Sequence, residues 1–64
     1  MKVKYDKEAD VIYISLSDKA IKESDEGKPG LILDYSADGS IVGIEILNVS
    51  KNLPQPYKME YELA

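Results

Sequence analysis

The chain is a 64-residue sequence with a net charge of −4 that contains no Cys, His or Arg. These absences exclude disulfides, Cys or His metal centres and Ser–His or Cys–His nucleophilic pairs, and the acidic balance argues against a nucleic-acid surface, which needs clustered Lys and Arg. A chain this short buries only about 60% of its unfolded surface, so self-association is the expected source of extra stability.

Alternation of polar and apolar residues predicts strands along most of the chain. The first covers residues 2–5, and the second covers residues 11–17, which are rich in β-branched and aromatic side chains. The polar segment 6–10 between them is expected to form a loop. Residues 20–26 contain a single strongly apolar side chain and predict an exposed edge strand, followed by a turn over residues 27–30.

The densest apolar sequence runs from residue 31 to residue 48 and is interrupted by Asp38-Gly39. An Asp-Gly pair between two apolar runs is a strong hairpin signal because Gly readily adopts positive φ. We therefore expect strands over residues 31–35 and 41–47. Gly43 lies within the second strand, where its missing side chain leaves room for a neighbour such as a Tyr ring to lie across it.

The composition changes after Asn48. Ser50 is a candidate cap for a short helical turn, which Pro54 and Pro56 prevent from extending. Residues 57–63 alternate strictly between apolar and polar, which predicts a half-buried strand. We expect a β-sheet core over residues 1–51 and, in the same domain, a C-terminal arm over residues 52–64 that pairs with its own chain or is exchanged with a neighbour's.

These elements together predict a mainly β fold: a small antiparallel sheet of four to six strands, connected largely as a meander, with at most one short helical turn. The apolar residues expected to share one face are Ile12, Ile14, Leu16, Val42, Ile44 and Ile46. A single sheet has nothing of its own to cover such a face. The sheet is therefore expected to curl into a half-barrel or to pack face to face with a second copy, and we predict a homodimer.

Carboxylates are the only side chains that suggest a ligand site. The candidate ligand or metal residues are Asp6, Glu8, Asp10, Asp34 and Glu45. The first three are spaced like the start of a calcium loop, but Val11 and Ser17 replace the Gly and the distal Glu that such a loop requires. The alternative, which we favour, is that Asp6 and Asp10 hydrogen-bond backbone amides and shape the turn.

Asp34 and Glu45 fall on adjacent predicted strands within apolar runs. Burial there would raise their pKa values and make them candidates for acid–base or metal chemistry. A structural pair neutralised by Lys or Tyr is the favoured alternative. No nucleophile elbow, phosphate loop or dinucleotide fingerprint is present. The sequence therefore favours a non-enzymatic role and implies no cofactor.

The chain has five Tyr but no Phe or Trp, and Tyr suits interfaces because it combines an apolar ring with a polar tip. The candidate interface residues are Tyr13, Tyr35, Tyr57, Met59, Tyr61 and Leu63. We expect a protein partner, either a second copy or a small neighbouring protein, and neither nucleic acid nor membrane. The longest apolar run is residues 11–14, and the N-terminal residues are charged, so a soluble cytoplasmic protein is expected.

Several stretches resemble a family of small prokaryotic domains, domain-of-unknown-function family 2283. They are residues 2–14 (KVKYDKEADVIYI), residues 30–35 (GLILDY), the Asp38-Gly39 turn and residues 41–48 (IVGIEILN). The resemblance covers residues 1–51 and implies a stand-alone, β-rich prokaryotic domain. It implies no activity, substrate or cofactor. Some members look like partners of small neighbouring proteins, which implies an antitoxin-like role as one possibility by analogy.

Overall fold

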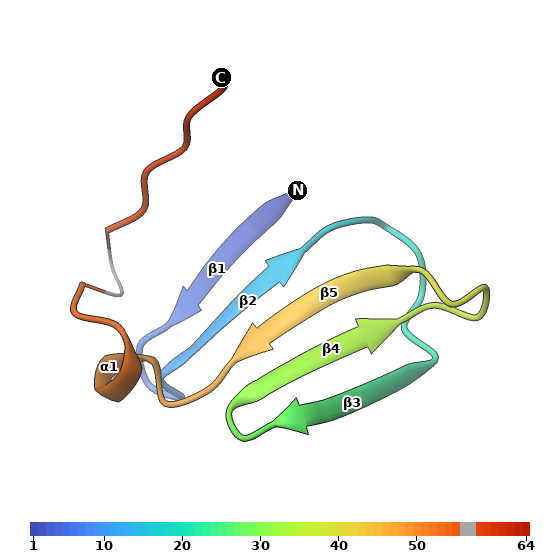
Figure 1. Ribbon diagram of the computed structural model, residues 1–64, viewed down its shortest axis with the longest axis horizontal. Coiled ribbons are helices and arrows are strands. Elements are labelled where there is room, and N and C mark those ends of the chain that lie inside the picture. The colour runs from blue at the N-terminus through green and yellow to red at the C-terminus, as the bar shows by residue number, and fades with distance from the viewer. Residues whose placement is uncertain (56–57) are drawn as a thin grey trace.

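The computed structural model describes residues 1–55 and 58–64, which form one open antiparallel sheet and a short helix (Figure 1). The strands are β1 (Lys2–Asp6), β2 (Val11–Ser15), β3 (Glu23–Lys28), β4 (Leu31–Tyr35) and β5 (Ile41–Ile46), and helix α1 (Val49–Asn52) follows. Their order across the five-stranded sheet is β1-β2-β5-β4-β3. The predicted small antiparallel β fold is confirmed. Within the described residues, no helix has the length and apolar character that a membrane crossing requires.

Most of the connections are hairpins, as a meander requires. They join β1 to β2, β3 to β4 and β4 to β5. The exception is the link between β2 and β3, which runs past the ends of β5 and β4 to the far edge of the sheet (Figure 1). The most apolar strand, β5, therefore lies at the centre and pairs with both β2 and β4.

Strand β3 is an exposed edge strand, as predicted, but its bounds differ from the predicted residues 20–26. It begins at Glu23 and continues through Gly27 and Lys28, which the sequence places in a turn. A register shift between Asp25 and Lys28 allows the strand to continue. The turn is thereby reduced to Pro29-Gly30, and Gly30 takes a φ of 84°.

The strand register sorts the side chains into two faces, because residues paired across antiparallel strands point to the same side. We call the first the apolar face. It consists of two rows across β1, β2, β5 and β4: Val3, Ile14, Ile44 and Leu33 in one, and Tyr5, Ile12, Ile46 and Leu31 in the other. The opposite face, the polar face, carries Lys4, Tyr13, Glu45 and Ile32 in one row and Lys2, Ser15, Gly43, Asp34 and Ser24 in the next.

A β-bulge modifies the predicted face near the start of β5. Asp34 pairs with Gly43 but Tyr35 pairs with Ile41, so Val42 is the extra residue. The bulge interrupts the predicted run of Val42, Ile44 and Ile46, while Ile12, Ile14, Ile44 and Ile46 share a face as expected.

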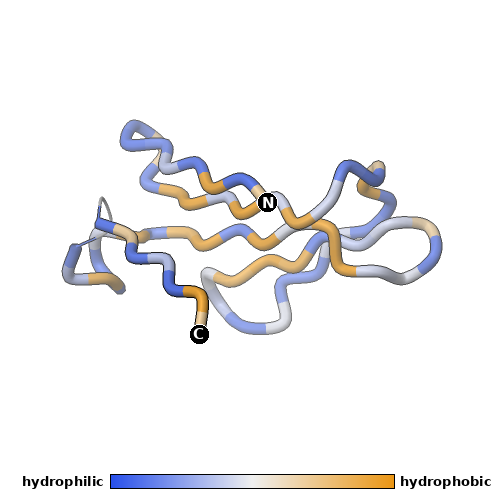
Figure 2. The backbone as a smooth tube through the Cα atoms, turned by 90° about the horizontal axis from the view of Figure 1, so that it is seen from above, coloured by the Kyte–Doolittle hydropathy of each residue, from blue (hydrophilic) through white to orange (hydrophobic). Residues whose placement is uncertain are grey.

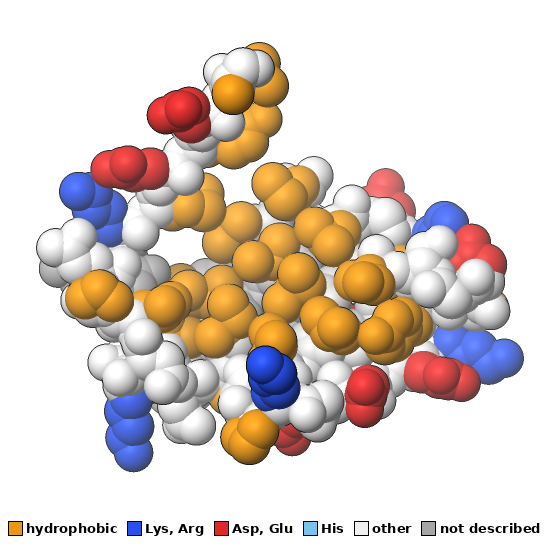
Figure 3. All heavy atoms as spheres, in the orientation of Figure 1, with side chains coloured by type: hydrophobic (Ala, Val, Ile, Leu, Met, Phe, Trp, Pro, Cys, Tyr) orange, Lys and Arg blue, Asp and Glu red, His pale blue; other side chains and the backbone are white. Residues whose placement is uncertain are grey.

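No second sheet covers the apolar face within the described chain. Figure 3 shows its hydrophobic side chains spread over the strands, with charged side chains around the margin, and none of its eight residues is buried. The buried hydrophobic residues are Val42 and Val49. Seen from above, hydrophobic and hydrophilic positions alternate along the strands of one thin layer (Figure 2). The described chain therefore has one layer and almost no core of its own.

The C-terminal arm leaves the sheet after α1 (Figure 1). A strand is predicted over residues 57–63, but residues 58–64 form no strand in the structure, and Tyr57 lies outside the described residues. The physical reason is that these residues have no backbone pairing partner within the described chain. Pairing with a neighbouring copy stays a prediction.

Candidate functional site

The polar face contains a buried carboxylate, and we call its surroundings the Asp34 site: Tyr13, Ser24, Asp34, Gly43 and Glu45. Asp34 is 0% exposed. Its Oδ1 accepts a hydrogen bond of 2.6 Å from the Ser24 hydroxyl on β3, whereas its Oδ2 is buried and has no hydrogen-bond partner among residues 1–55 and 58–64. Buried polar atoms are nearly always paired, so this oxygen marks the site as unusual.

Gly43 is the residue that allows this packing. A β-carbon built at position 43 would lie 2.6 Å from the Tyr13 hydroxyl oxygen and 3.1 Å from Asp34 Oδ2. The end of the Tyr13 ring thus occupies the space that a side chain at position 43 would need. This confirms the expectation that a Tyr ring lies across Gly43, and it explains how an open sheet buries Asp34 on its polar face.

Glu45 is the second carboxylate of the site. It pairs with Tyr13 and lies two residues along β5 from Gly43, the partner of Asp34. Such diagonal neighbours are within reach of long side chains. Burial and the nearby Asp34 carboxyl raise the pKa of Glu45, and burial followed by the Asp34 charge raises the pKa of Tyr13. The structure places Asp34 and Glu45 on adjacent strands, as the sequence predicts, but the sequence gives no sign of Ser24.

The raised pKa of Glu45 predicts that Glu45→Gln stabilises the protein at neutral pH. The folded state binds the Glu45 proton more tightly than the unfolded state, so its contribution to stability is present below the ordinary pKa of 4.5 and is lost as the pH rises through the higher folded-state pKa. Removing a like-charge neighbour should raise the free energy of unfolding by about 0.2–1 kcal/mol at pH 7.

Urea unfolding of the wild type and the Glu45→Gln variant between about pH 4 and pH 8 measures this difference. Both proteins are studied in EDTA. The two should converge at the acidic end and diverge toward neutral pH. A variant less stable than the wild type at pH 7 would contradict the assignment.

The other predicted carboxylates lie in the turn between β1 and β2, away from the Asp34 site. Asp6 accepts a 3.0 Å hydrogen bond from the Ala9 amide, and Glu8 is exposed. Asp10 has a left-handed φ of 58° and accepts hydrogen bonds from the amide (3.0 Å) and hydroxyl (2.7 Å) of Ser50. These contacts lower the pKa of Asp10. Asp6 thus bonds a backbone amide within the turn, whereas the carboxylate of Asp10 bonds Ser50 outside it.

Asp10 has a second effect that the sequence does not reveal. Asn48, at the N-terminal end of α1, makes no capping hydrogen bond with its side chain. The carboxylate of Asp10, 40 residues away in sequence, satisfies the Ser50 amide at this helix end. Asp10 therefore caps the start of α1, and Ser50 is not the cap that the sequence predicts. Among residues 1–55 and 58–64, no group of three or more acidic side chains is placed to share a metal ion.

Asp38 organises the hairpin between β4 and β5. It accepts hydrogen bonds from the Ser36 hydroxyl and the Ser40 amide, and forms a 2.8 Å ion pair with Lys19. Lys19, and then the Ser36 and Ser40 contacts, hold the pKa of Asp38 well below its usual range. Gly39 takes the positive φ, 85°, that the sequence predicts.

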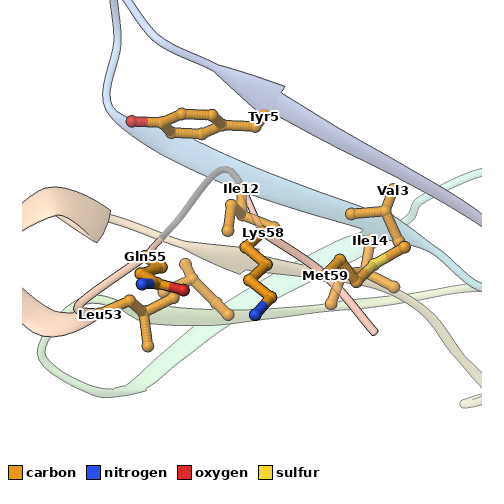
Figure 4. Close-up of a pocket in the computed structure, with 9 residues that line it drawn as sticks. Val3, Tyr5, Ile12, Ile14, Leu53, Gln55, Lys58 and Met59 are labelled. Carbon is orange, nitrogen blue, oxygen red and sulfur yellow. The ribbon is translucent and has the colours of Figure 1, made fainter. Parts of the chain in front are cut away.

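The second candidate site is the apolar face together with the start of the C-terminal arm. The two enclose a groove of about 440 Å³ (Figure 4). The sheet contributes Val3, Tyr5, Ile12, Ile14 and Ile46, and the arm contributes Leu53, Gln55, Lys58 and Met59. The lining is mostly apolar, so the groove suits hydrophobic side chains better than a polar ligand.

The predicted interface residues do not all lie on this surface. Tyr13 lies on the polar face, in the Asp34 site. Tyr35 lies on the same side of the sheet as Leu33, which belongs to the apolar face. On the arm, Met59, Tyr61 and Leu63 are 67%, 76% and 87% exposed. A single surface lined by all the Tyr residues is therefore not formed within the described chain.

A protein-family model matches the chain. The model of DUF2283, described as a protein of unknown function, matches residues 2–50, which include both candidate sites apart from the arm residues of the groove. No curated protein and no solved structure matches the chain. The matched segment covers most of the sequence, so the chain belongs to the DUF2283 family, a family of unknown function.

Proposed function

We propose that the protein is an assembly module in which two copies pack through their apolar faces. The observation that carries this proposal is the uncovered face itself: eight apolar side chains in two regular rows, none of them buried. Sheets that pack face to face lie about 10 Å apart and bury such rows between them. A second copy supplies a layer of matching composition and shape.

The dimensions of the chain support this arrangement. A compact 64-residue domain has an expected radius of gyration of about 10.7 Å, whereas this chain has 12.4 Å. A folded monomer of its mass exposes about 4,100 Å², whereas this chain exposes 5194 Å². The excess is about 1,100 Å², and a stable dimer needs about 800 Å² from each partner. The surplus surface is thus large enough for a dimer.

The arm gives a second contribution to the same interface. Met59 lines the groove beside the apolar face, and Tyr61 and Leu63 extend beyond it with most of their surface exposed. In a dimer these side chains reach the partner's sheet. Exchange of a terminal segment between identical chains is a low-cost route to a dimer.

A small partner protein in an antitoxin-like pair is the competing occupant of the apolar face. A second copy is preferred because the rows are uniformly apolar and the surplus area matches one side of a standard interface. We place the protein in the cytoplasm, in keeping with the absence of Cys.

Light scattering across a dilution series tests the proposal. From about 100 µM down to 1 µM, we expect a mass near twice 7.1 kDa that falls toward the monomer on dilution. Replacing Met59, Tyr61 and Leu63 by Ser should weaken association by about tenfold or more, because three exposed apolar side chains are lost from the interface. A folded monomer at every concentration would overturn the proposal.

A matched control keeps the length and extension of the arm. The double variant Glu60→Gln, Glu62→Gln changes only polar residues, which alternate along the arm with the apolar Met59, Tyr61 and Leu63. Because the apolar side chains are kept, the dissociation constant should stay close to that of the wild type. If the Ser variant and this control dissociate alike, the arm has no part in the interface. If the purified chain is monomeric but forms a one-to-one complex with another small protein, the competing occupant is correct.

A further inference from the structure

We propose that the Asp34 site binds a hard divalent cation of the Mg²⁺ or Mn²⁺ type between Asp34 Oδ2 and the Glu45 carboxylate. The first observation is the unpartnered oxygen: Asp34 is fully buried, yet its Oδ2 accepts no hydrogen bond from the part of the chain that the structure describes. A buried carboxylate is costly unless it is paired or coordinates a metal. The ion pairs among the described residues do not involve Asp34 or Glu45.

The second observation is that two acidic groups share the site. Glu45 lies diagonally opposite Asp34, and both belong to the polar face. Two neighbouring carboxylates repel one another unless a proton or a cation lies between them. A cation at this point supplies the partner that Oδ2 lacks and removes the repulsion at the same time.

The donor atoms select the kind of cation. The side-chain donors are the carboxylates of Asp34 and Glu45 and the hydroxyls of Tyr13 and Ser24, so the site offers oxygen and neither nitrogen nor sulfur. Oxygen donors suit Mg²⁺, Mn²⁺ and Ca²⁺. Ca²⁺ takes six to eight oxygen ligands, whereas Mg²⁺ keeps several waters and needs only one or two carboxylates. A site with two carboxylates therefore fits Mg²⁺ better than Ca²⁺.

The backbone brings the Tyr13 hydroxyl close to the unpartnered oxygen. Gly43 has no β-carbon, and the Tyr13 hydroxyl oxygen and Asp34 Oδ2 lie 2.6 Å and 3.1 Å from the position that a β-carbon would take, so the hydroxyl occupies the space at position 43. The bulge at Val42 is adjacent, and bulges commonly re-aim side chains beside functional sites. The site lies on the polar face, opposite the apolar face of the proposed dimer. The proposal is therefore independent of the dimer.

Paramagnetic broadening by Mn²⁺ tests this inference on the full chain. In amide-resolved NMR spectra at substoichiometric Mn²⁺, we expect the signals of Asp34, Gly43 and Glu45 to broaden first. Excess Mg²⁺ should restore them, and so should EDTA. Broadening confined to other carboxylates, or no broadening at all, overturns the proposal, and a proton shared by the two carboxyls then explains the site.

Three variants localise the effect. Asp34→Asn and Glu45→Gln keep the shape of each side chain and should each weaken Mn²⁺ binding by about tenfold or more. Asp18→Asn makes the same change at an exposed position outside the site and should leave binding unchanged. If Asp34→Asn fails to fold, as its own spectrum will show, Glu45→Gln decides the matter. Equal binding in Glu45→Gln and the wild type overturns the inference.

Discussion

Ile44→Lys is expected to abolish self-association while the sheet still folds. Ile44 lies on the central strand β5 and pairs with Ile14 and Leu33 in the middle of the apolar face. In the dimer, each copy would bury an unpaired ammonium group, which costs about 3 kcal/mol or more, equivalent to over a hundredfold in the dissociation constant. In the monomer the Lys side chain can extend along the face and keep its charge in water.

Ile32→Lys is the matched control, because Ile32 is also half-buried but belongs to the polar face, opposite Glu45. Sedimentation equilibrium measures the dissociation constants, and far-ultraviolet circular dichroism checks that both variants are folded. We expect the Ile32 variant to remain dimeric. If both variants dissociate alike, or if Ile44→Lys remains a dimer, the apolar face is not the interface.

Gly43→Ala is expected to lower the free energy of unfolding by about 1–3 kcal/mol, the usual cost of overpacking. The new β-carbon would lie 2.6 Å from the Tyr13 hydroxyl oxygen and 3.1 Å from both Tyr13 Cζ and Asp34 Oδ2. Part of the strain should be relieved when Tyr13→Phe removes the hydroxyl, so the cost of Gly43→Ala should be smaller in the Tyr13→Phe background. Urea unfolding of the four proteins measures this coupling.

Gly27→Ala is the control for the same chemical change. Gly27 also lies in a strand, and a β-carbon there would meet only Asp25 Oδ2, at an ordinary 3.7 Å. Its effect should stay within about 0.5 kcal/mol. Equal losses of stability at positions 27 and 43 would show that replacing a glycine in any strand has this cost, and that the packing of Tyr13 over Gly43 does not set it.

The sequence predicts the local parts of this fold well because they depend on period-2 alternation and turn chemistry. The shared face of Ile12, Ile14, Ile44 and Ile46 follows from the alternation visible in each strand, and the Asp38-Gly39 hairpin follows from its turn residues. The placement of β5 between β2 and β4 does not. It depends on contacts between segments distant in sequence, for which alternation carries no signal.

The candidate site shows the same division. Asp34 and Glu45 stand out because each is an acid within an apolar run. Ser24 has no such mark, since it lies in a polar strand and gains its role only from pairing with Asp34. Asp10 resembles a loop carboxylate in sequence, and its contact with Ser50 exists only because the β1–β2 turn and α1 meet at one end of the sheet.

Isotope-filtered nuclear Overhauser spectroscopy on a mixture of labelled and unlabelled chains tests the central claim most directly, because it detects contacts between copies and names the residues that make them. We predict intermolecular signals from the methyl groups of Ile12, Ile14, Ile44 and Ile46. A sample with no intermolecular signal from these methyl groups, at a concentration where the chain is folded, would contradict the account.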